Sequence, residues 1–136
     1  MLHIGDIATR TGKSVHTIRW YEAQGLILGV TRDAAGRRVY ADAHIGWLTL
    51  MDRLRLTGMS VAEMRGYTDL VRQGKPTLKA RQSLLRAHRR RVLDTIADWQ
   101  QALALLDHKI DFYGLWLESG HRPPEIALPT TRRRQA

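Results

Sequence analysis

The sequence contains no cysteine, and this absence excludes several kinds of chemistry at once. Disulfide bonds, zinc sites with cysteine ligands, iron–sulfur clusters, thiolate nucleophiles and thiol redox sensors all require that residue. The longest uninterrupted apolar run also falls far short of the roughly 20 residues that span a bilayer. The N-terminus lacks the basic and apolar regions of a secretory signal. We therefore expect a cytoplasmic protein without a membrane segment.

Signatures of enzymes are equally absent. The sequence has no nucleophile–base pair, no phosphate-binding loop and no paired acids in a pocket-like context. His88 and His108 are candidate metal ligands by residue type, but the neighbouring Arg89–Arg91 would repel a cation. The sequence thus predicts no catalytic residue, no metal site and no cofactor.

Positive charge is present in excess. The 136 residues include 22 Lys and Arg against 13 Asp and Glu, which gives a formal net charge of +9. Such a charge favours a polyanionic partner. The hydrophobic fraction of 43% is ordinary for a folded domain and argues against wholesale disorder. The length suits roughly one domain with an appendage.

The first forty residues have the pattern of a winged helix-turn-helix. A short helix over residues 5–11 ends at Gly12, and Ser14 is placed to cap a second helix that runs to about residue 24. Two short helices joined by a small turn are typical of the helix-turn-helix. Residues 28–40 then alternate like a hairpin with its turn at residues 33–36, which predicts a wing.

Two further helices are expected after the wing. Asp42 is placed to cap the first of them, in which Trp47 and Leu54 belong to an apolar face with helical spacing. Ser60 and Glu63 have the spacing of a capping box for the next helix, which runs to about residue 73.

The segment over residues 78–117 contains no proline and carries apolar residues at alternating steps of four and three. This heptad spacing predicts one long helix whose apolar seam is covered by a second copy. The residues assigned to dimerisation are Leu85, Val92, Ile96, Trp99, Leu103, Leu106, Ile110 and Tyr113.

Charge predicts the direction of that pairing. Residues 75–91 carry basic side chains and no acid, whereas the following part of the helix is acidic through Asp94, Asp98, Asp107 and Asp111. Antiparallel pairing places the basic half of one helix beside the acidic half of the other, and parallel pairing would place like beside like. We therefore predict an antiparallel homodimer.

The second helix of a helix-turn-helix reads the major groove, mainly through its N-terminal residues. His16 and Thr17 are short polar groups that suit base edges, whereas Arg19 and Tyr21 suit phosphate or sugar contacts. On the wing, Arg37–Arg38 suits the neighbouring backbone or the minor groove. Trp20, which lies between Arg19 and Tyr21 in the sequence, is as compatible with core packing as with a role at the surface.

The segments IGDIATRTGKSVHTIRWYEAQGLI and GRRVYADAHIGWLTLMDRLRLTGMSVAEMR resemble the MerR family of bacterial transcription regulators. The resemblance covers about residues 2–73 and includes T-I-R-x-Y-E, G-L, G-x-R-x-Y and G-M-S-x-x-E in that order. It implies a homodimer, paired through an antiparallel coiled coil, that binds a promoter inverted repeat within an overlong spacer. It also implies bending and untwisting of this double-stranded DNA so that RNA polymerase can use both promoter elements.

The resemblance also assigns residues to the DNA surface by position. Trp20 stands where many members have tyrosine. The residues placed at the DNA are His16, Thr17, Arg19 and Tyr21 on the recognition helix, Arg37, Arg38 and Tyr40 on the wing, and Arg55 near the backbone.

The effector is less determined. Metal-sensing members use cysteines at the ends of the dimerisation helix, and multidrug sensors carry a large C-terminal domain, whereas fewer than twenty residues follow the predicted long helix here. The closest resemblance is to the small subgroup linked to aldehyde and electrophile stress, which implies a stress-response activator. Arg53 stands at the position of that subgroup's cysteine. The alternatives are therefore another signal, response through a partner, or no response.

We expect a mainly α-helical fold in three parts. Residues 1–76 form a winged-helix DNA-binding domain, residues 77–118 a coiled-coil dimerisation helix, and residues 119–136 a flexible basic tail. The alternative function is that of a DNA-architectural protein, excisionase-like or nucleoid-like, without effector control. The long dimerisation helix favours the regulator.

Overall fold

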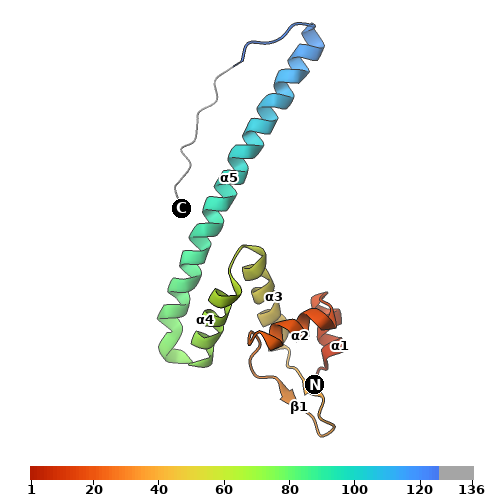
Figure 1. Ribbon diagram of the computed structural model, residues 1–136, viewed down its shortest axis with the longest axis vertical. Coiled ribbons are helices and arrows are strands. Elements are labelled where there is room, and N and C mark those ends of the chain that lie inside the picture. Colours follow the sequence, from red (N-terminus) through yellow and green to blue (C-terminus); the bar gives the residue numbers. More distant parts are fainter. Residues whose placement is uncertain (126–136) are drawn as a thin grey trace. The chain divides into compact units, whose positions relative to one another are not determined.

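The computed structural model describes residues 1–125, and these are mainly helical (Figure 1). The helices are α1 (Ile4–Thr11), α2 (Val15–Ala23), α3 (Ala43–Leu56), α4 (Val61–Arg72) and α5 (Leu78–Ser119). Strands β1 (Thr31–Arg32) and β2 (Arg38–Val39) lie between α2 and α3, and a 3₁₀ turn, η1 (Lys75–Thr77), precedes α5. Residues 1–89 form one compact unit, and a second unit begins at Arg90. No helix in the described part combines the length and hydropathy of a membrane span.

The helix-turn-helix forms as its helix-ending and helix-capping residues predict. Gly12 ends α1 with φ 69°, a left-handed conformation that glycine adopts without steric cost. Ser14 caps α2, because its side chain accepts a hydrogen bond from the Thr17 amide at 3.1 Å. Lys13 in the turn pairs with Asp52 of α3 at 2.7 Å, which fixes the turn against the third helix.

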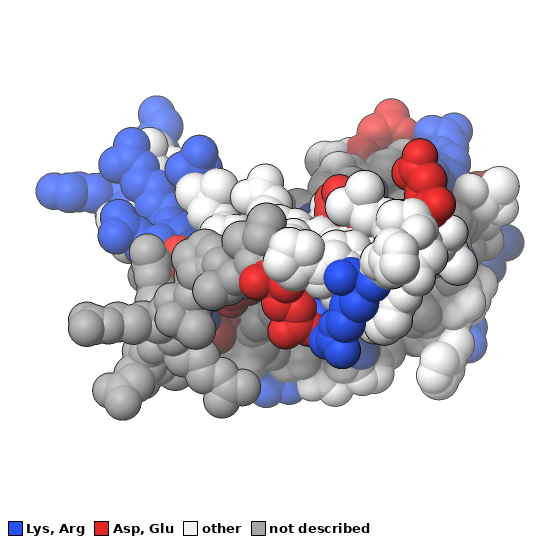
Figure 2. All heavy atoms as spheres, turned by 90° about the horizontal axis from the view of Figure 1, so that it is seen from above, with Lys and Arg blue, Asp and Glu red and all other residues white. Residues whose placement is uncertain are grey.

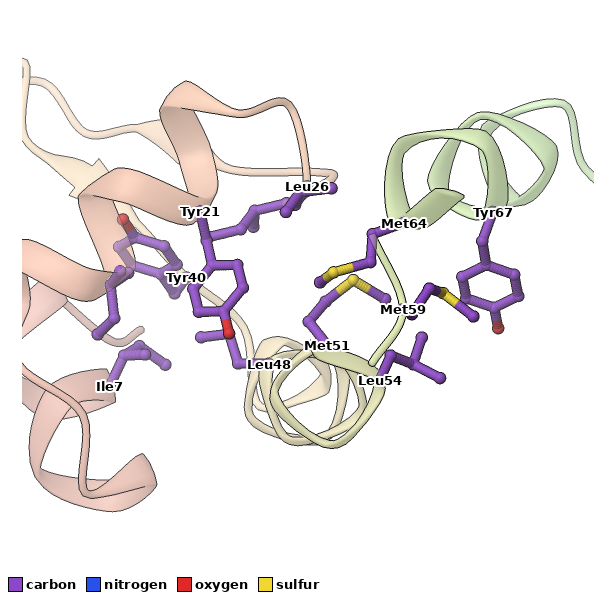
Figure 3. Packing of buried hydrophobic residues seen from close by; sticks show 12 residues of the cluster. Ile7, Tyr21, Leu26, Tyr40, Leu48, Met51, Leu54, Met59, Met64 and Tyr67 are labelled. Atoms are coloured by element: carbon purple, nitrogen blue, oxygen red, sulfur yellow. The ribbon is translucent and has the colours of Figure 1, made fainter. Parts of the chain in front are cut away.

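The core of the first unit lies where α1, α2, α3 and α4 meet (Figure 3). Ile7 of α1, Tyr21 of α2 and Leu48 of α3 are fully buried, and Met51 and Met64 join α3 to α4. Trp47 of α3 also stacks on Tyr67 of α4 at 5.7 Å between ring centroids. Burial of these large apolar side chains is the main term that holds the short helices together.

The wing has the expected turn but shorter strands than its sequence pattern predicts. β1 and β2 pair antiparallel, with Thr31 opposite Val39, whereas residues 28–30 are not in a strand. The reason is that α3 competes for this backbone. Trp47 donates to the carbonyl of Leu26 at 2.6 Å, and the His44 ring bonds the carbonyl of Leu28 at 2.5 Å.

One predicted helix cap is wrong and another is confirmed. Asp42 makes no capping hydrogen bond at the start of α3, because its backbone is already helical and its carboxylate pairs with Arg10 at 3.2 Å. Ser60 does cap α4, since its side chain accepts from the Glu63 amide at 3.1 Å.

The first turns of α5 are fixed to the compact unit by polar contacts. Arg81 donates to the Gly74 carbonyl at 2.6 Å and to the Val71 carbonyl at 3.3 Å, so its guanidinium binds the end of α4 and does not only add charge to the surface. His88 is 5% exposed, and its Nε2 lies 2.7 Å from the hydroxyl of Thr57 at the end of α3. Leu85, predicted to dimerise, packs partly against this core, which makes it at least in part a residue of its own chain's interior.

From Arg90 onward, α5 continues with its apolar seam exposed. Trp99 is 75% exposed, Leu103 57% and Ile110 66%. After the helix, Arg122 lies over the ring of Trp116 at 5.5 Å and pairs with Glu125 at 2.9 Å. This part of the predicted flexible tail therefore contacts the helix, while Arg132–Arg134 lie outside the described residues.

Candidate nucleic-acid interface

The recognition helix α2 presents two of its predicted contact residues to solvent. His16 and Arg19 are exposed, whereas Ile18 on the opposite side is fully buried. Thr17 is half-buried, and its hydroxyl lies 2.9 Å from that of Ser14. The helix therefore presents the imidazole of His16 and the guanidinium of Arg19 to solvent, whereas the Thr17 hydroxyl contacts the Ser14 side chain that caps α2.

Arginines from distant positions line a cleft beside this helix. The cleft has a volume of about 360 Å³, and none of the described residues that line it is acidic. Its lining consists of His3, Ile4, Arg19, Arg32, Gly36, Arg37 and Arg38. The start of α1, the recognition helix and the wing thus converge on one basic concavity, which is the electrostatic character that a phosphate backbone requires.

Two of these lining residues were missed by sequence reasoning. Arg32 precedes the wing turn, and its guanidinium donates to the Gly36 carbonyl at 2.6 Å, which holds it beside the hairpin. His3 lies near the wing because its ring nitrogen is 3.3 Å from the carbonyl of Arg38. Arg32 was detectable as a third basic residue of the hairpin, but His3 had no local signal.

The wing turn is organised by one carboxylate. Asp33 accepts from the amides of Ala35 at 3.0 Å and Arg37 at 2.9 Å, and it pairs with the Arg37 guanidinium at 3.1 Å. These interactions, led by the Arg37 amide, lower the pKa of Asp33 below its usual 3.8. The charged form of Asp33 therefore shapes the loop that carries Arg37.

A second carboxylate ties the wing to the recognition helix. Arg38 donates from Nε to both carboxylate oxygens of Glu22, at 2.9 and 2.7 Å. The hydrogen bond with Glu22 raises the pKa of Arg38 above its usual value. Glu22 therefore fixes the direction of Arg38, whereas Arg32 and Arg37 are held within the hairpin by the Gly36 carbonyl and by Asp33.

Arg55, predicted to lie near the DNA backbone, stacks on the recognition helix. Its guanidinium carbon lies 4.3 Å from the centroid of the Trp20 ring. Trp20 is half-buried, packs against the core, and contacts Tyr21 edge-on at 5.2 Å. Trp20 therefore packs against the core and also presents its ring to the guanidinium of Arg55.

Two predicted DNA contacts lie in the core instead. Tyr21 has no exposed surface and Tyr40 is 2% exposed, so neither side chain can touch DNA in this conformation (Figure 3). Both side chains belong to the hydrophobic core cluster. Tyr40 is also fixed by a backbone bridge to Leu2. The Tyr40 hydroxyl is buried without a hydrogen-bond partner among the described residues. Burial raises the pKa of Tyr40 above its usual 10.0.

The charge distribution fits an anionic partner better than a metal. Figure 2 shows a group of Lys and Arg side chains standing together at one side of the view. Within the part of the chain that the structure describes, no three His, Asp or Glu side chains are grouped as metal ligands. His88 is engaged with Thr57 rather than directed to a cation.

Comparison with known proteins gives a consistent result. The family model described as "MerR HTH family regulatory protein" matches residues 2–70. An uncharacterised HTH-type transcriptional regulator of Haemophilus influenzae is 34% identical over 106 residues, which are 78% of each chain. The regulator AdhR of Bacillus subtilis is 32% identical over 93 residues, 68% of this chain and 66% of AdhR.

Solved structures are similar over most of the chain. The first is HiNmlR, described as a MerR family regulator lacking the sensor domain and bound to promoter DNA. It has a TM-score of 0.76 and 31% identity, covering 87% of this chain and 94% of HiNmlR. A MerR family transcriptional regulator from Listeria monocytogenes has a TM-score of 0.83 and 34% identity, covering 88% and 91% of the two chains.

Proposed function

This chain belongs to the MerR family of helix-turn-helix transcription regulators, and we propose that it acts as a homodimer on one inverted repeat in a promoter. The family consists of DNA-binding regulators and not of enzymes. The proposed target is a spacer longer than usual between two promoter elements, which the dimer distorts so that RNA polymerase uses both. Deformation of DNA makes specificity depend on bases that the protein does not contact.

The observation that carries this proposal is the basic cleft between the recognition helix and the wing. Arg19 comes from α2, and Arg32 and Arg37 come from the hairpin, so one phosphate strand passing the cleft meets cations from both elements. His16 lies exposed on the same helix for base contact. The likeness to HiNmlR, whose structure contains promoter DNA, supports the same use of this surface.

A homodimer is part of the proposal because α5 exposes an apolar seam that a second copy covers. The exposed side chains recur at heptad spacing, which is the pattern of coiled-coil partners. We further propose that no thiol takes part in signal detection, since the sequence contains no cysteine. Activation and a stress signal are expectations from the resemblance to the aldehyde-related subgroup.

The first test is genome-wide mapping of binding by the full chain, followed by footprinting of the strongest site. A protected inverted repeat inside a lengthened promoter spacer is the expected result. Dispersed binding without symmetry would contradict regulation of a promoter and would instead support a DNA-architectural role.

A matched pair of variants tests the cleft separately. Arg32→Ala with Arg37→Ala removes two cleft cations and leaves the Glu22–Arg38 pair intact. The logarithmic salt slope of DNA binding should fall by about two, because roughly one counterion is released per phosphate contact. Arg72→Ala, outside the cleft lining, is the control and should leave the slope unchanged. Equal slopes for both variants would argue against the cleft.

A further inference from the structure

His44 of α3 lies beside the segment that joins the recognition helix to the wing. Residues 26–30 of this segment are in neither a helix nor a strand. The carbonyl of Leu28 accepts a hydrogen bond from a side chain instead, because Nε2 of His44 lies 2.5 Å from it. Within the part of the chain that the structure describes, no backbone amide donates to this carbonyl. The imidazole therefore satisfies the buried polar group at the entry to the wing.

The other nitrogen of the same ring holds the exit from the wing. Nδ1 of His44 accepts from the amide of Ala41 at 2.9 Å. Because a carbonyl can only accept, Nε2 carries the proton of the bond to Leu28, and a neutral imidazole satisfies both partners. The side chain is buried, and the ring of Tyr40 meets it edge-on at 5.6 Å between centroids. One buried side chain thus joins the two ends of the wing.

We propose that His44 is the positioning residue of the wing, and that it sets where the arginines of the hairpin lie relative to α2. Joining residues 28 and 41 through one imidazole fixes the base of the segment over residues 29–40, which carries Arg32 and Arg37. His44 acts on DNA binding through these two cleft cations and does not itself touch DNA. The inference rests on the proposed DNA-binding function and adds to it a residue outside the cleft.

The hairpin is too short to hold this position by itself. β1 and β2 are joined by two residue pairs, Thr31 with Val39 and Arg32 with Arg38. An isolated two-stranded hairpin is at best marginally stable in water. The position of the wing must therefore come from contacts at its base.

The two strands of the wing are held by different contacts. β2 is tied to the recognition helix by the ion pair between Arg38 and Glu22. Among the described residues, Arg32 of β1 makes its side-chain hydrogen bond within the hairpin and not to a helix. The hydrogen bond from His44 to Leu28 therefore links the β1 side of the wing to α3.

The backbone turns directly over this imidazole. Gly29 has φ 75°, the left-handed conformation that glycine adopts without steric cost. A Cβ at this position would lie 3.8 Å from Nε2 of His44, which is ordinary van der Waals contact. The wing thus begins in contact with the ring that closes its base.

A pair of substitutions separates the two hydrogen bonds of the ring. His44→Gln carries an amide nitrogen to the position of Nε2 and keeps a donor for Leu28, whereas His44→Asn places an oxygen at the position of Nδ1 and keeps only the acceptor for Ala41. We expect His44→Gln to retain the natural affinity for a fluorescent random-sequence DNA duplex to within about twofold. His44→Asn and His44→Ala should lower the logarithmic salt slope of binding by about two, because Arg32 and Arg37 move away from the phosphate strand.

The order of the two variants distinguishes positioning from simple support of α3. If His44 only satisfied the Ala41 amide at the start of this helix, His44→Asn would retain DNA binding and His44→Gln would lose it. That reverse order would overturn the proposal.

Combined substitutions test whether His44 acts through the wing arginines. His44→Ala together with Arg32→Ala and Arg37→Ala should have the same salt slope as the two arginine substitutions alone, because the same phosphate contacts are lost only once. A further fall in slope on adding His44→Ala would show that His44 acts on binding by another route.

Leu50→Ala is the matched control for loss of stability. Leu50 lies on the same helix and packs partly against the core. This variant should lower the midpoint of urea unfolding while keeping the natural salt slope, since the base of the wing is intact. If Leu50→Ala reduced the slope as much as His44→Ala, the effect would be general destabilisation and the positioning role would be wrong.

Amide chemical shifts of residues 29–40, measured without DNA, separate this inference from the proposed function. His44→Asn should change these shifts, and His44→Gln should leave most of them in place. Unchanged shifts in His44→Asn would refute the positioning role alone. Failure of the natural chain to bind any duplex would instead refute the proposed function.

Discussion

The guanidinium carbon of Arg55 lies 4.3 Å from the ring centroid of Trp20, so a cation on α3 is held against the recognition helix. This contact joins two elements that are far apart in sequence. Trp20 is also fixed by the core, which makes it a platform that restricts where the Arg55 charge can go. Trp20 is therefore expected to position a phosphate-binding cation without touching DNA.

Replacing Trp20 with Ala should weaken DNA binding about two- to fivefold, because Arg55 loses a stacking contact of about 0.5–1 kcal/mol. Trp20→Tyr should retain most of the affinity, since a ring remains. Combining Trp20→Ala with Arg55→Ala should cost little more than Arg55→Ala alone in fluorescence anisotropy titrations. Arg53→Ala is the control, because Arg53 lies on the same helix and stacks on no aromatic ring among the described residues. Fully additive losses would show that Trp20 and Arg55 act separately.

The exposed face of α2 should divide into a base-reading residue and a backbone-binding residue. Arg19→Ala is expected to weaken binding to specific and random DNA alike and to reduce the salt slope by about one. His16→Ala should change base preference at one position, at a cost of about 1–3 kcal/mol for the preferred sequence. Competition titrations with a randomised operator measure both effects. Equal losses on specific and random DNA for both variants would refute this division.

Removing the hydroxyl of Tyr40 should stabilise the fold or leave it unchanged. The group is buried without a partner among the described residues, so Tyr40→Phe removes a desolvation cost of up to about 1 kcal/mol. A small rise in melting temperature with unchanged DNA affinity is the expected pair of results. If Tyr40→Phe instead lowered the affinity for DNA at unchanged stability, Tyr40 would be a DNA-contacting residue.

The wing should lose order at acid pH through Asp33. The pKa of this carboxyl is lower in the folded chain than its usual 3.8, so its contribution is present above pH 3.8. It is lost as pH falls through the lower folded value, because the protonated group holds the Ala35 and Arg37 amides less well. Amide chemical shifts of these residues report the step. Asp33→Asn should abolish it, and an unchanged acid transition in that variant would assign the step to another group.

A charge in the seam should dissociate the proposed dimer. Leu103→Glu places a carboxylate among exposed apolar side chains that a partner would cover, and sedimentation should show a monomer at concentrations where the natural chain dimerises. Leu105→Glu is the matched control, because Leu105 is exposed but outside the seam. A dimer that survives Leu103→Glu would refute the seam assignment.

The features that depend on neighbouring residues could be predicted from the amino-acid sequence. Gly12 and Ser14 define the turn and cap between α1 and α2, and Ser60 caps α4, because each acts on backbone groups within a few positions. The long helix and its exposed seam likewise follow from a local heptad period. The helical fold and the family were predictable for this reason.

Contacts between distant segments of the chain establish which side chains reach the surface and which groups meet. Tyr21 and Tyr40 are of a type that commonly contacts phosphate, yet both are buried, because the faces that carry them are the ones that α1 and α3 cover. The cleft depends on Arg32 and His3, which approach Arg19 only after the hairpin has folded beside α2. Local patterns encode periodicity and caps, whereas burial and convergence depend on contacts between residues distant in sequence.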